Sequence, residues 1–241
     1  MVMLDMAKDR KKNGEEHGLL IHHIPRWLKD QVKRKFLNML KPEVFERFSE
    51  EELQECIDEA CGPLTAIDMV IMLKNMDSLC EKCGECCRNC DPILFTDRDV
   101  QRLKKFMGKE VLAFFKRHGK GYTPIKTRPC IFFDEQTKRC TIYEIRPDVC
   151  RLFPLKTDSK FGLILQITPY CKVPINYLAY RATGILIGKM IKKENPALDK
   201  AIETQVKEIC EELGISKSSS PIRQLSKAFE LYNILSRGRK R

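Results

Sequence analysis

Apolar residues recur at helical spacing near the start of the chain. Trp27, Val32, Phe36 and Leu40 follow Pro25, a residue that is favoured in the first turn of a helix. A hydrophobic stripe of this kind is typical of a helix with one buried face. The pattern therefore predicts that the folded part of the chain begins as a helix.

Capping residues mark the next helices. Ser49 and Glu52 form a capping-box pair, and the helix that they open is expected to stop at Gly62. A further helix is expected from residue 63 to about residue 75, where it leads into a run of cysteines. The first third of the chain is therefore predicted to be helical.

A second capping box stands after the cysteine run. Thr96 and Asp99 form it, and they predict an amphipathic helix that continues to about Gly108. Residues 110–117 are expected to form another helix, which ends at Gly119.

The pattern then changes to that of short strands. Residues 131–133 and 141–143 flank a polar loop, which suggests a small β-hairpin, and residues 162–168 are a candidate third strand. From Pro174 onward the pattern is helical again. The predicted fold class is α+β, mainly α, with helical flanks around a small core that carries a β-hairpin.

Charge is distributed unevenly along the chain, whose formal net charge is +11. Residues 41–79 carry ten acids against three bases, whereas residues 98–128 carry ten bases against two acids. A basic surface can serve nucleic-acid binding or solubility. The bases of 98–128 alternate with apolar residues whose spacing suits a helix core better than base stacking, namely Leu103, Phe106, Leu112, Phe114 and Phe115. Nucleic acid is therefore a possible partner but not the favoured one, and other partners stay unknown.

No segment resembles a membrane span or a signal peptide. The longest apolar stretch, 175–191, is interrupted by Arg181 and Lys189, whereas a span needs roughly 20 apolar residues. Residues 7–16 are almost entirely polar, so the apolar core of a signal peptide is lacking. We expect a cytoplasmic protein without membrane contact.

Twelve cysteines are many for such a chain, and a reducing compartment disfavours disulfides. The strongest signal is the closely spaced run Cys80, Cys83, Cys86, Cys87 and Cys90. Two-residue gaps let neighbouring thiolates converge on one metal, and part of the run has the spacing of bacterial ferredoxins. The flanking residues are too polar for a buried core. The run is therefore interpreted as a set of metal ligands.

Four later cysteines extend this set. Cys130, Cys140 and Cys150 are each separated by nine residues, and Cys171 follows. Cys130 and Cys140 flank the predicted hairpin, whose turn would bring them together. As a group beside the first run, these four are predicted to be ligands as well.

The remaining cysteines are interpreted differently. Cys56 and Cys61 lie in an apolar helical stripe, as does Cys210, so all three are predicted to be core residues. The histidines, His22, His23 and His118 among them, are expected to be solvated. We find no phosphate-binding loop, nucleophile elbow or paired His-Glu motif, so enzymatic activity stays uncertain.

The combined motif of residues 80–87, Cys130 and residues 140–154 resembles the CxxCxxCC (YkgJ-type) cysteine-cluster family, which is described as zinc- or iron-chelating. The resemblance covers residues 80–171. It implies a metal site with eight ligands: Cys80, Cys83, Cys86, Cys87, Cys130, Cys140, Cys150 and Cys171. Cys90 falls outside the family pattern and is a possible accessory ligand.

Eight thiolates fit two four-cysteine zinc sites, or one iron–sulfur cluster with a zinc site or spare ligands. The near-ferredoxin spacing and the all-sulfur composition favour an iron–sulfur cluster over zinc. The favoured function is a metal-binding protein. The alternatives are an iron–sulfur-dependent enzyme, since the cysteine pattern is distantly similar to that of flagellin lysine-N-methylase, and a metal-gated nucleic-acid-binding protein.

These observations divide the chain into four parts. We expect a disordered basic N-terminus at 1–18, a helical region at 19–79, a cysteine-cluster metal-binding domain at 80–171, and a helical region with a basic tail at 172–241.

Overall fold

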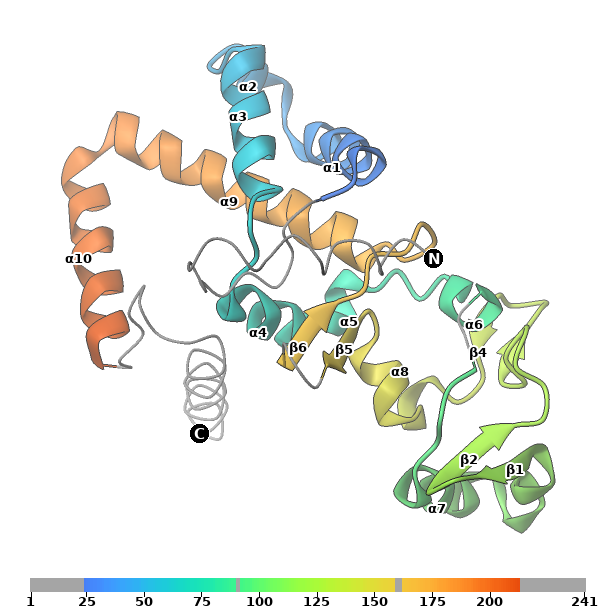
Figure 1. Cartoon of the computed structure of the whole chain (residues 1–241). Coiled ribbons are helices and arrows are strands. Elements are labelled where there is room, and N and C mark those ends of the chain that lie inside the picture. Colours follow the sequence, from blue (N-terminus) through green and yellow to red (C-terminus); the bar gives the residue numbers. More distant parts are fainter. Residues whose placement is uncertain (1–23, 90–91, 159–161, 213–241) are drawn as a thin grey trace, which may run out of the picture.

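The computed structural model describes residues 24–89, 92–158 and 162–212 (Figure 1). The predicted disordered N-terminus, His22, His23, Cys90 and the basic tail lie outside these residues. Within them the fold is α+β and mainly α, as predicted. The described helices include none that is both long enough and apolar enough to cross a membrane.

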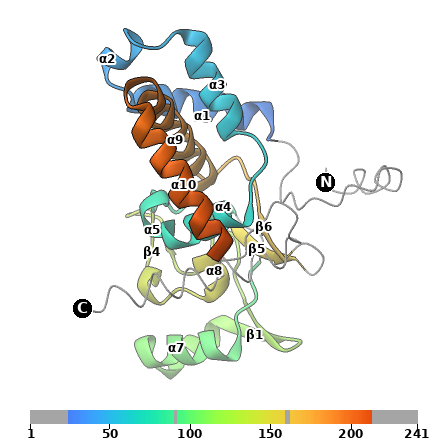
Figure 2. The same ribbon diagram turned by 90° about the vertical axis from the view of Figure 1, so that its left-hand side faces the viewer.

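Three helices form a helical body at one end of the molecule (Figures 1 and 2). Helices α1 (Arg26–Met39) and α3 (Glu50–Ala60) pack on the long α9 (Val173–Glu194). The short α2 (Pro42–Phe45) connects the first two, and α10 (Pro196–Glu212) follows α9. The capping box of Ser49 and Glu52 is present at the start of α3, as predicted.

The buried face of α1 differs by one residue from the prediction. Leu28, Val32 and Phe36 are buried, whereas Trp27 is 37% exposed. Positions 28, 32 and 36 are four apart, so they lie above one another on one side of the helix. Trp27 precedes the first residue of this stripe and is not part of it.

Short elements lead from the body towards the opposite end of the molecule. They are α4 (Ala66–Lys74), α5 (Met76–Leu79), α6 (Glu85–Asn89), the hairpin β3 (Phe133–Asp134) and β4 (Arg139–Cys140), the turn η3 (Tyr143–Ile145), α8 (Asp148–Leu152), and the hairpin β5 (Leu155–Asp158) and β6 (Gly162–Leu165). The predicted hairpin at 131–143 is confirmed in shorter form, and the predicted strand at 162–168 is confirmed as β6. Helix α4 begins three residues later than predicted because Thr65 and Asp68 form a capping box.

The far end is a small unit that we call the ribbon lobe: α7 (Asp97–Met107), η2 (Lys109–Phe114), β1 (Phe115–His118) and β2 (Gly121–Pro124). Helix α7 carries the predicted capping box of Thr96 and Asp99. The predicted helix at 110–117 is wrong, because a 3-10 helix ends at Phe114 and a strand follows. Phe115 pairs with Pro124 in the ribbon, and its ring lies 4.8 Å from that of Phe95.

The buried apolar side chains of the described residues form two cores. The body core is built from α1, α3, α4 and α9, together with Leu155, Leu165 and Cys171. The lobe core holds Phe95, Val100, Leu103, Val111, Phe115, Phe132 and Ile142. The segments that carry the cysteines lie between these two cores.

Candidate metal centre

A cavity of about 120 Å³ lies between the two cores. All eight cysteines that were predicted to be ligands line it: Cys80, Cys83, Cys86, Cys87, Cys130, Cys140, Cys150 and Cys171. The rest of the wall is largely apolar. Met76 and Val173 contribute from the body core, and Phe95, Phe132 and Ile142 contribute from the lobe core.

A sharp turn positions the first cysteines. Cys80 directly follows α5, and its N–H donates to the carbonyl of Met76 at 2.9 Å. Lys82 and Gly84 then adopt φ values of 53° and 74°, which curl the chain into α6, where Cys86 and Cys87 lie. These left-handed conformations are the means by which a short run folds back around a common centre.

Gly84 is also the point of closest approach to the β3–β4 hairpin. A β-carbon at this position would lie 2.4 Å from Cε2 of Phe133 and 2.5 Å from the carbonyl oxygen of Lys138. Neither gap admits a methyl group, and φ is positive. Glycine is therefore required where the first cysteine run meets the hairpin.

The later cysteines reach the cavity from separate elements. The N–H of Cys130 donates to the carbonyl of Cys87 at 2.8 Å, which joins the two segments directly. Cys140 lies on β4, and Cys150 lies on α8. Cys171 precedes α9, and its N–H donates to Thr168 at 3.3 Å.

The thiols influence each other across the cavity. The Cys87 thiol hydrogen-bonds with the sulfur of Cys86 or of Cys140, since its one hydrogen can be donated to only one of them at a time. These bonds lower the pKa of Cys86, lower the pKa of Cys140 to about 7, and raise the pKa of Cys87 itself. Burial raises the pKa of Cys130 and raises that of Cys171 to about 12. The set thus holds protons that metal binding would release.

Cationic side chains accompany the thiols. The guanidinium of Arg146 lies 3.8 Å from the centroid of the Tyr143 ring and forms an ion pair with Asp77 at 3.0 Å. The ammonium of Lys82 lies 4.8 Å from the same ring. Lys172 also lines the cavity. These charges favour thiolates and offset the negative charge of a thiolate-bound metal.

Two side chains that hold the cysteine-bearing segments in place were not predicted from the sequence. Asn176 on α9 is 6% exposed, and its amide donates to the carbonyl of Leu79 at 2.8 Å and to the carboxylate of Glu81 at 3.2 Å. It therefore holds the chain on both sides of Cys80. An asparagine one turn into a helix carries no sequence signal for this role.

The second such side chain comes from the ribbon lobe. Arg102 on α7 donates to the carbonyl of Arg146 and forms an ion pair with Asp148, both at 3.2 Å. The buried carboxylate of Asp99 accepts the N–H of Asp148 at 3.3 Å. Side chains of α7 thus fix the start of α8, two residues before Cys150.

The positions of the other cysteines agree with the core prediction where the structure describes them. Cys56 is fully buried in the body core, and Cys61 packs against that core. The side chain of Cys210 is outside the described set. His118 is exposed on β1.

Within the described ranges, no three His, Cys, Asp or Glu side chains already stand as ligands of a single ion. The donor chemistry nevertheless fits a thiolate-bound metal, because eight sulfur atoms surround one cavity with apolar walls. Binding would require these side chains to turn towards shared centres.

Comparisons with known proteins agree with this donor chemistry. Residues 79–172 match the model of the CxxCxxCC family, which is described as "Putative zinc- or iron-chelating domain". The resemblance expected from the motif is thereby confirmed for this segment. An uncharacterized protein of Methanocaldococcus jannaschii is 35% identical over 89 residues, which cover 34% of this chain and 47% of that protein. No solved structure matches the chain.

Proposed function

We propose that the cysteine cavity binds metal through thiolates and that the metal joins the ribbon lobe to the helical body. The observation that carries this proposal is the convergence of eight cysteines on one cavity between the two cores. The proposed domain spans residues 80–171. Among the described residues, no disulfide joins the cysteines that line the cavity.

The first proposed centre is an iron–sulfur cluster held by Cys80, Cys83, Cys86 and Cys171. The first three have the spacing of a ferredoxin run. Cys171 is proposed as the fourth because it lines the same cavity and is buried where the chain enters α9. Its burial at the base of α9 would shield the cluster from solvent.

The second proposed centre is a zinc site held by Cys87, Cys130, Cys140 and Cys150. The N–H of Cys130 donates to the carbonyl of Cys87 at 2.8 Å, and Cys140 follows on the β3–β4 hairpin. Four cysteines from separate parts of the segment would form a closed site of the kind that stabilises small domains. Such a site would be structural.

Metal analysis of single variants tests this division. Protein purified anaerobically is expected to contain both metals and to absorb broadly near 400 nm. Cys171→Ser should remove the iron and the colour but leave the zinc, whereas Cys140→Ser should remove the zinc first. Cys61→Ser is the matched control, since Cys61 does not line the cavity, and it should keep both metals.

Two results would contradict the proposal in different ways. Absence of iron and zinc from the anaerobic protein would refute metal binding altogether. A colourless protein with two zinc ions would refute only the iron–sulfur assignment, and equal loss of both metals in both variants would refute the division into two centres.

A further inference from the structure

One face of the β1–β2 ribbon is largely exposed among the described residues, except at Gly121, which packs against Leu94 and Phe95. Phe114 and Ile125 extend the ribbon as an opposed pair, since the N–H of Ile125 donates to the carbonyl of Phe114 at 2.9 Å. The next pair on the same face is Lys116 and Thr123, and His118 follows. We call these five residues the ribbon face.

The opposite face of the ribbon supplies the contacts to the lobe core. Phe115 and Pro124 are buried there. By contrast, Phe114 is 48% exposed and Ile125 is 63% exposed. The expectation that the apolar residues of 98–128 form a helix core is thus wrong for Phe106, Leu112 and Phe114, all of which are exposed. Large apolar side chains gathered on a small lobe indicate an interaction surface.

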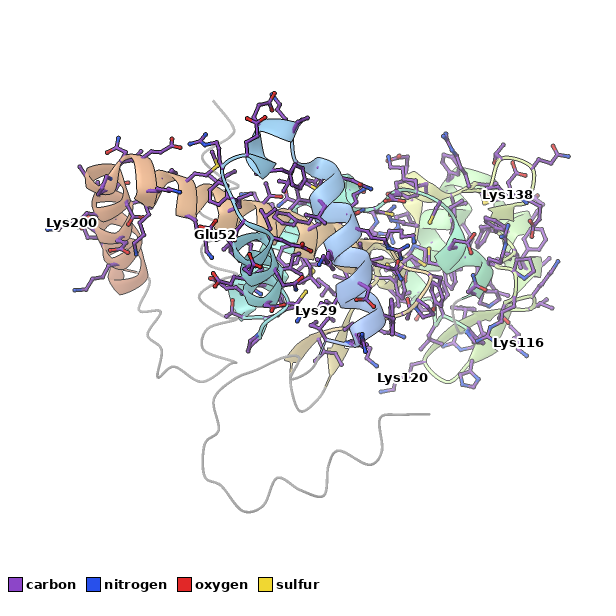
Figure 3. All side chains as sticks on the ribbon, turned by 90° about the horizontal axis from the view of Figure 1, so that it is seen from above. Lys29, Glu52, Lys116, Lys120, Lys138 and Lys200 are labelled. Carbon is purple, nitrogen blue, oxygen red and sulfur yellow. The ribbon has the colours of Figure 1, made fainter. Side chains whose placement is uncertain are left out.

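The segment that carries this face, residues 98–128, is strongly basic. Lys105, Lys109, Lys120 and Lys126 are exposed, and within the described part of the chain none of them forms an ion pair. Figure 3 shows Lys116 and Lys120 at the outside of the lobe. Of the two acids in residues 98–128, Asp99 is buried and paired with Arg102, which leaves Glu110. The complementary partner is therefore a polyanion.

We propose that the ribbon face binds single-stranded nucleic acid. Proteins bind single strands with basic surfaces that hold the backbone phosphates and with exposed rings on which bases stack. The ribbon face provides both, because the exposed Phe114 and the exposed Lys116 are successive positions on it. Stacking requires bases that are free of a duplex, so unpaired strands are the expected ligand.

The ribbon face contains no metal ligand, but the side chains that pack beneath it also line the cysteine cavity. Phe95 and Phe132 line the cysteine cavity, and their rings pack against Phe115 on the buried side of the ribbon. The binding face therefore stands on side chains that also form the wall of the metal site. Binding should be tested with the full chain as purified.

Fluorescence anisotropy with labelled oligouridylate and oligothymidylate is the direct test. Both single strands should bind more tightly than a duplex, and two such probes distinguish RNA from DNA. Phe114→Ala should weaken binding by about 5- to 150-fold, the loss expected when stacking of about 1–3 kcal/mol is removed. Phe114→Tyr should retain it. Lys116→Glu should weaken binding to all strands and reduce its salt dependence.

Matched variants on the helical body test whether binding is specific to the ribbon face or arises from exposed rings and lysines anywhere on the protein. Phe45→Ala removes a ring that is 49% exposed on α2, and Lys192→Glu changes a lysine on α9. Both should bind like the unmodified protein. The proposal is overturned if Phe114→Ala binds as well as Phe45→Ala, if duplexes bind as tightly as single strands, or if phosphatidylserine vesicles bind in place of the oligonucleotides.

Discussion

The helical body and the segment that carries the cysteines are stabilised in different ways. Among the described residues, 24 buried residues form the body core, three of which (Leu155, Leu165 and Cys171) come from the segment itself, and the body helices pack directly on the 22 residues of α9. The lobe core has seven buried residues, and each of its two strands has four residues. Between the cores lies a cavity lined by thiols rather than a packed layer.

This difference indicates where the stability of each region comes from. Apolar burial stabilises a domain in proportion to the area removed from water, and a small core seldom offsets the entropy of ordering its chain. The segment also contains long loops, such as the 42 residues between Cys87 and Cys130. The body should therefore fold by burial alone, whereas the segment should depend on ligation.

Removal of the metal should have the largest effect. Ligation contributes roughly 10 kcal/mol or more to the folding of small metal sites, and this contribution would be lost for residues 80–171 only. We expect the apo protein to keep most of its helical circular dichroism while this segment becomes sensitive to proteases. Limited proteolysis of metal-bound and chelator-treated protein, with cuts mapped by mass spectrometry, measures the difference.

Equal protection of the segment in both forms would show that the lobe core is sufficient. In that case the two regions would not differ in the origin of their stability.

Truncation of a buried side chain in the body core should have a smaller effect than removal of the metal. Leu28 is 1% exposed, so Leu28→Ala should lower the free energy of unfolding by about 2–5 kcal/mol. Its neighbour Trp27 is 37% exposed, and Trp27→Ala should cost clearly less. Denaturant titrations of both variants test this, with metal content measured on the folded protein. Loss of metal in folded Leu28→Ala would mean that the body also shapes the cavity.

Replacement of a core cysteine should have the smallest effect. Cys56 is fully buried and does not line the cavity, so Cys56→Ala should cost on the order of 1 kcal/mol and keep full metal occupancy. Cys86→Ala, the comparison variant at the cavity, should lose metal. If Cys56→Ala halves the bound metal, the division between core cysteines and cavity cysteines is wrong.

The same comparison explains what the sequence could predict. Capping pairs such as Ser49 with Glu52 predict helices of the body and α7. The spacing of the cysteines predicts that they are ligands. Local patterns of this kind are read directly from the chain. The 110–117 segment was mispredicted because Phe115 is placed by contacts with Phe95 and Phe132, which are distant in sequence.

The anchors of the site were missed for a similar reason. Asn176 acts on Leu79 and Glu81 across 95 or more positions, and Arg102 acts on residues more than 40 positions away. The sequence identified the residues around the cavity, but not what holds them. How the eight thiols share the metal stays a proposal.

The tight contact at Gly84 determines how much of the chain would be needed to transplant the cysteine site onto another protein. At Gly84 the first cysteine run packs against Phe133 and Lys138 with no room for a methyl group. A peptide of residues 80–90 would therefore lack the hairpin that this run packs against. Asn176 extends the requirement into α9. A graft onto another scaffold would therefore have to carry the chain from Met76 to Asn176 as one block.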